Sequence, residues 1–64
     1  MDQSNREVLK VAARQFGAAE RKCRSLLRYL ELATFASDAA VNELLDEAEA
    51  NANAALARIA GLKR

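Results

Sequence analysis

Apolar residues that recur at alternating steps of three and four dominate the first half of this chain. An α-helix turns once every 3.6 residues, so this spacing places them all on one face of a helix. The series comprises Leu9, Ala12, Phe16, Ala19, Cys23, Leu26, Leu30 and Ala33. It predicts a long helix over about residues 3–36. Ser4 and Glu7 have the spacing of a capping box, which satisfies the free amides at a helix start.

The register of the apolar residues changes near Ser37. Continuing the first series would place Glu47 on the apolar face, whereas a shifted series restores the helical spacing. That second series comprises Val41, Leu45, Ala48, Ala52, Ala55, Ile59 and Leu62. Ser37 is a favourable N-cap, and Asp38 suits the positive end of a helix dipole. We therefore expect a turn near residue 37 and a second helix over about residues 38–60, ended by Gly61.

The chain has 64 residues, no proline, no histidine and a single cysteine. It cannot form an internal disulfide, and it lacks the histidines of most zinc sites. Domains this small that lack both usually gain their stability by oligomerising. We therefore predict an all-α fold with a single domain over residues 1–64. This domain is an antiparallel helical hairpin that pairs with a second copy into a dimeric four-helix bundle of coiled-coil type.

Folding the chain at residue 37 defines which residues of the two series meet. Cys23 falls beside Ala48, and Phe16 falls near Ile59. Small residues on facing rows let helices approach closely, while larger ones fill the layers between. We therefore expect Cys23 to be a small apolar residue of the core rather than a reactive thiol.

A second group of large apolar side chains lies near the turn and outside the seam between the helices. It comprises Leu27, Tyr29, Leu32, Phe35 and Leu44. Apolar and aromatic groups that the chain's own core does not use are typical anchors for helix-in-groove binding. The leading hypothesis is therefore a small non-enzymatic protein–protein interaction module of bacterial or phage origin. It would act as a regulator, inhibitor or chaperone, through homodimerisation, docking on a helical partner protein, or both.

Basic residues gather in the first half of the chain, where seven Lys/Arg stand against four Asp/Glu in residues 1–36. Arg14, Arg21 and Arg28 recur every seventh residue, opposite the apolar series. Such a stripe can follow the phosphates of a nucleic acid, or it can simply face solvent. The alternative hypothesis is therefore a dimeric RNA-binding hairpin that uses these three arginines.

In its length, hairpin layout and single seam, the chain resembles the Rop family of plasmid copy-number regulators. That resemblance implies a homodimeric four-helix bundle that binds paired RNA loops, and it assigns a role to no individual residue. The chain is similar at the same level to helical-hairpin chaperones of secretion needles and to small phage inhibitors of host regulators. These resemblances imply docking on proteins instead.

Other classes of function find little support in the sequence. The chain has no histidine and no glycine-rich phosphate loop, and it is too short to enclose an ordinary substrate pocket. We therefore expect no enzymatic activity, no metal and no cofactor. No run approaches the ~18 apolar residues that span a bilayer, and the polar start lacks a signal-peptide core. With one thiol and no export signal, the expected location is the cytoplasm.

Overall fold

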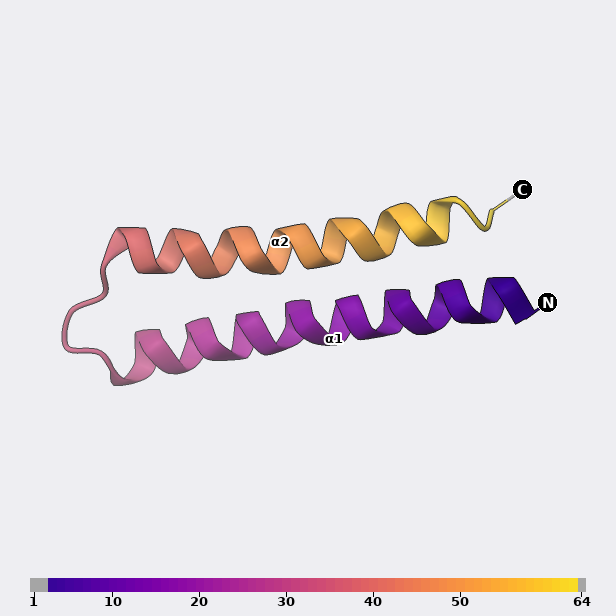
Figure 1. Cartoon of the computed structure of the whole chain (residues 1–64). Coiled ribbons are helices and arrows are strands. Elements are labelled where there is room, and N and C mark those ends of the chain that lie inside the picture. The colour runs from indigo at the N-terminus through magenta and orange to yellow at the C-terminus, as the bar shows by residue number, and fades with distance from the viewer. Residues whose placement is uncertain (1–2, 64) are drawn as a thin grey trace.

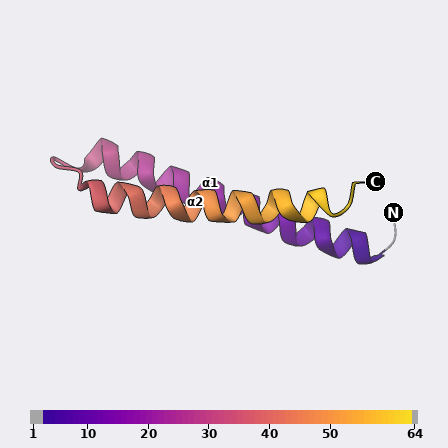
Figure 2. The same cartoon turned by 90° about the horizontal axis from the view of Figure 1, so that it is seen from above.

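Two long antiparallel helices joined by a short loop form the whole of the described structure (Figure 1). The computed structural model describes residues 3–63, so residues 1, 2 and 64 of the expected domain lie outside it. Helix α1 runs over Gln3–Leu32 and helix α2 over Asp38–Ala60. The helices cross at a shallow angle (Figure 2), and the hairpin measures 50 × 15 × 12 Å. The predicted all-α antiparallel hairpin is thus confirmed.

Helix α1 ends at Leu32, four residues earlier than the apolar periodicity predicts. Residues 33–37 form the loop, which must span the roughly 8–10 Å between packed helix axes. A helix continuing to residue 36 would leave too little chain for that step. Tyr29 fixes the loop, since its hydroxyl accepts a hydrogen bond from the backbone N–H of Ser37 at 2.8 Å.

Ser37 is the N-cap of α2, as predicted. Its backbone is extended, and its side-chain oxygen accepts a hydrogen bond from the N–H of Ala40 at 3.4 Å. Asp38 follows in the first turn, where a carboxylate is favourable. At the other end Gly61 closes the helix, donating its N–H to the carbonyl oxygen of Ala57 at 3.2 Å. The positions that begin and end α2 are therefore those that the sequence indicates.

The core between the helices consists of alanines. The buried apolar residues of the described chain are Ala12, Ala19, Ala48 and Ala55. Alanine side chains let the two backbones approach closely. Leu26, Val41 and Leu62 continue the same rows and are half-buried. The large residues of the neighbouring rows, such as Phe16, Leu30 and Leu45, lie beside the alanines and are exposed.

Cys23 corrects the prediction made from the sequence, because it is exposed and not part of the core. The apolar series of α1 consists of two adjacent rows, and a single partner helix covers only one of them fully. Ala12 and Ala19 belong to the covered row. Cys23 and Phe16 belong to the other, which lies at the edge of the contact with α2 and stays accessible.

A candidate interaction surface on one face of the hairpin

Two polar contacts between the helices define one face of the hairpin, here called the polar face. The ammonium nitrogen of Lys22 lies 2.8 Å from a carboxylate oxygen of Glu47. Nε of Arg58 donates a hydrogen bond to Oε1 of Gln15 at 3.0 Å. All four residues flank the alanine core on the same side, so this side of the seam is bridged within the chain.

The opposite side of α1 follows from helix geometry. Gln15 and Lys22 each come three residues after a buried alanine, Ala12 or Ala19. One helical turn takes 3.6 residues, so three residues make less than a full turn and four make more. Residues four positions after the same alanines therefore lie on the other side of that row. Phe16 and its heptad neighbours therefore flank the core on the side away from the polar face.

The same geometry places the flank of α2. Arg58 comes three residues after the buried Ala55, and it hydrogen-bonds Gln15, which comes three residues after the buried Ala12. In both helices, therefore, residues three positions after a buried alanine lie on the polar face. Residues four positions after a buried alanine therefore lie together on the opposite face. Phe16 of α1 and Ile59 of α2 are such residues. We call this opposite side the apolar face. Its members are Leu9, Phe16, Cys23 and Leu30 of α1 and Leu45, Ala52 and Ile59 of α2, with Leu27 and Leu56 at its borders.

The apolar face is accessible along most of its length. Leu9, Phe16, Leu45 and Leu30 are between 37 and 49% exposed, and the border residues Leu27 and Leu56 more than half exposed. The named members of the face carry no charged side chain, and Asp38 continues their α2 row at the start of that helix. Six of the eight exposed large apolar residues of the described chain belong to this face or its borders. The hairpin therefore has one bridged polar side and one open apolar side.

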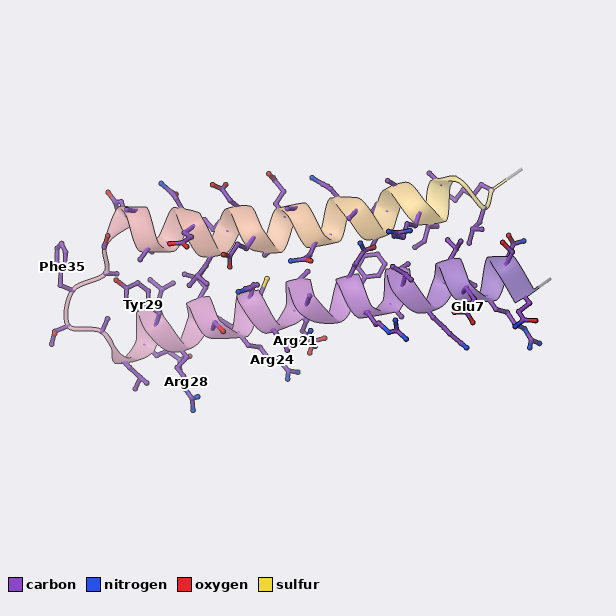
Figure 3. All side chains as sticks on the ribbon, in the orientation of Figure 1. Glu7, Arg21, Arg24, Arg28, Tyr29 and Phe35 are labelled. Atoms are coloured by element: carbon purple, nitrogen blue, oxygen red, sulfur yellow. The ribbon has the colours of Figure 1, made fainter. Side chains whose placement is uncertain are left out.

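The residues predicted as anchors near the turn do not form one surface. Leu27 borders the apolar face. Leu32 is 75% and Phe35 82% exposed, and Phe35 projects from the loop (Figure 3). Tyr29 and Leu44 are half-buried and lie in the rows of the polar face, and the Tyr29 hydroxyl is already bonded to Ser37. The structure thus divides this group between the apolar face, the loop and the polar face.

The sequence alone places the main residues of the apolar face in the internal seam. It predicts that Phe16, Leu30 and Ile59 fill the space between α1 and α2. One signal could have separated them: within each series, the row of large residues runs beside a row rich in alanine. Because alanine rows pack closely against each other, the row of large residues needs a second layer outside the hairpin.

Basic residues form a stripe on α1 on the side away from α2 (Figure 3). Arg14, Arg21 and Arg28 are exposed, and none of them makes an ion pair within residues 3–63. By contrast, Arg24 is paired with Glu20, and Lys10 is paired with Glu7 at 3.2 Å. The three arginines predicted to contact nucleic acid thus share one open surface.

Over residues 3–63 the hairpin encloses no pocket and has no cluster of three side chains placed to hold a metal ion. Neither α1 nor α2 has the length and apolar character needed to cross a bilayer. No family model, curated protein or solved structure matches this chain.

Proposed function

We propose that this chain is a non-enzymatic helical interaction module whose apolar face docks against other helices, first those of a second copy. The product would be a dimeric four-helix bundle. The observation that carries this proposal is the pair of adjacent rows of large apolar side chains left open on one side of the hairpin. Extended apolar patches bordered by polar residues mark interaction sites in soluble proteins.

The small core supports the same proposal. Alanine buries little apolar surface, so a hairpin held by four buried alanines gains little hydrophobic stabilisation. Full burial of a leucine or phenylalanine contributes about 1.5–3 kcal/mol, and such residues are only partly covered here. Covering Leu30 and Phe16 of both copies would therefore stabilise the helices and the dimer together.

A face that accepts helices also fits a role in controlling another protein. A helical segment of a target can occupy the same rows by the helix-in-groove mode, with Leu30 and Phe16 as anchors. This is the physical basis for proposing a regulator, inhibitor or chaperone. No chemical step is required of the chain for such a role.

Dilution should unfold the protein. We expect a solution mass of twice 7.0 kDa at high concentration. The melting temperature, followed by circular dichroism, should rise with concentration because dimerisation stabilises the folded state by mass action. Cys23 provides an internal probe: its alkylation by a thiol reagent should slow as the dimer forms, because its row becomes covered. A monomeric mass with concentration-independent melting and alkylation would contradict the proposal.

RNA binding is a second candidate function, favoured by the open stripe of Arg14, Arg21 and Arg28. Three cations at heptad spacing on one side of a helix can contact successive phosphates of a structured RNA. Their side chains are free of ion pairs within the described chain, so binding would break no ion pair there.

The triple Arg14→Gln, Arg21→Gln, Arg28→Gln variant tests this second function. If the stripe binds RNA, affinity for a paired RNA stem-loop should fall at least about tenfold at low salt. The dependence of affinity on salt should also become shallower, by roughly 0.7–0.9 per lost phosphate contact. Arg24→Gln is the control, since Arg24 is engaged by Glu20. Equal RNA binding by the triple variant and the wild type would remove this candidate.

A further inference from the structure

We propose that in the dimer α1 of one copy packs antiparallel against α1 of the other, with the two loops at opposite ends of the bundle. This inference rests on the proposed self-association and specifies its geometry. In this dimer the apolar face of one copy is covered by the apolar face of the second copy. The amount of surface that the hairpin leaves open and the charges along the border of that face both favour this dimer.

The hairpin exposes more surface than a folded chain of its mass should. Its solvent-accessible area is 5023 Å². A compact monomer of 7.0 kDa is expected to expose about 4,000 Å², so the excess is about 1,000 Å². A stable interface removes about 800 Å² from each partner. One copy placed on the apolar face therefore covers about as much surface as a stable dimer requires.

Two-fold symmetry permits two ways of stacking the apolar faces. With the axis perpendicular to the helices, α1 meets α1, α2 meets α2, and the loops lie at opposite ends. With the axis along the helices, α1 meets α2 of the other copy, and the loops lie at the same end. The apolar rows meet in both arrangements, so the charged residues that border the face must distinguish them.

The antiparallel α1–α1 arrangement matches side chains by size. When Leu9 lies beside Leu30 of the second copy, the large Phe16 lies beside the small Cys23 of that copy. In the same register, the exposed Leu27 covers the small Ala13 of the second copy, which is otherwise an exposed alanine. Large side chains thus meet small ones along this contact, as close packing requires.

The same register brings opposite charges together. Arg6 comes within two residues of the level of Glu31 of the second copy, about 3 Å along the helix axis. Both residues are exposed at the border of the apolar face, and neither makes an ion pair within residues 3–63. Because the dimer is two-fold symmetric, the contact between Arg6 and Glu31 occurs twice in it. The register also brings Glu20 of the two copies together near the two-fold axis, where the ion pair of each with Arg24 offsets its charge.

The other arrangement brings like charges together. The Lys22–Glu47 and Gln15–Arg58 contacts set the relative levels of α1 and α2 in the hairpin to within one helical turn. When α1 meets α2 of the second copy at those levels, two charged residues of α1 that make no ion pair within residues 3–63 each come within about one turn of a like charge. These are Glu31, near Asp38, and Arg6, near Lys63. Like charges at an interface disfavour it, so the border favours the antiparallel α1–α1 contact.

Charge reversal tests this geometry through the sign of its effect. Arg6→Glu or Glu31→Arg alone should raise the dimer dissociation constant roughly two- to tenfold at low salt, measured by sedimentation equilibrium. The double variant should restore wild-type affinity, and high salt should shrink all the differences. In the other arrangement each single reversal would replace repulsion by attraction and tighten the dimer. Tighter single variants would therefore overturn the inference.

A distance measurement tests it independently. A nitroxide label is placed on Thr34→Cys in the loop, in a Cys23→Ala background whose dissociation constant is first shown to match the wild type. Loops at opposite ends should give a distance close to the 50 Å length of the hairpin. Loops at the same end would give less than about 25 Å, since neighbouring axes are 8–10 Å apart. A short distance overturns the geometry alone, whereas a monomeric mass overturns both the geometry and the self-association.

Discussion

Replacing Ala55 with leucine is expected to lower the free energy of unfolding by about 2–3 kcal/mol, the upper range for overpacking a close contact. Ala55 has no exposed surface and lies in the row that faces α1. A leucine there must push the two helices apart or bend its own side chain away from a favoured rotamer. The alanine core contributes so little stability that this change should leave much of the chain unfolded at ordinary temperatures.

Ala50→Leu is the matched control, because Ala50 is an exposed residue of the same helix. Leucine and alanine are both good helix formers, so this change should alter stability by no more than about 0.5 kcal/mol. Thermal melts followed by circular dichroism compare the two variants at equal concentration. If Ala55→Leu melts at the same temperature as Ala50→Leu, the close alanine contact does not hold the hairpin together.

Leu30→Asp is expected to abolish self-association, raising the dissociation constant at least about 100-fold. Leu30 is 49% exposed in the hairpin and lies on the apolar face. In the dimer its replacement would bury two carboxylates per bundle, and each unpaired buried charge costs several kcal/mol. Solution mass and sedimentation equilibrium measure the effect, and Leu45→Asp on α2 should reproduce it from the other helix.

Leu32→Asp tests whether partners dock on the apolar face or on the apolar residues near the turn that the sequence predicts as anchors. Leu32 is the same residue type, two positions further along the same helix, and 75% exposed outside the apolar face. Its replacement should change the dissociation constant little, as should Phe35→Asp in the loop. If Leu32→Asp and Phe35→Asp abolish association while Leu30→Asp does not, partners dock at the turn and the apolar face is not the interface.

The two helices could be predicted because their signals are local. The three-and-four spacing of apolar residues requires no knowledge of what packs against them, and the Ser37 side chain caps a helix that begins at the next residue. The end of α1 could not be predicted in this way. Residues 33–37 contain neither glycine nor proline. The helix ends at Leu32 because the chain must cross to α2 and because Tyr29 bonds the amide of Ser37.

The sequence by itself determined that two adjacent apolar rows run along each helix and that the chain is too small to cover both. Only the tertiary structure decided which row is used. Ala12 and Ala19 face Ala48 and Ala55, since small side chains allow the closest approach of the two backbones. That choice turns Phe16, Cys23 and Leu30 outward. The open face thus results from the rotation of each helix about its own axis, which periodicity within one helix does not determine.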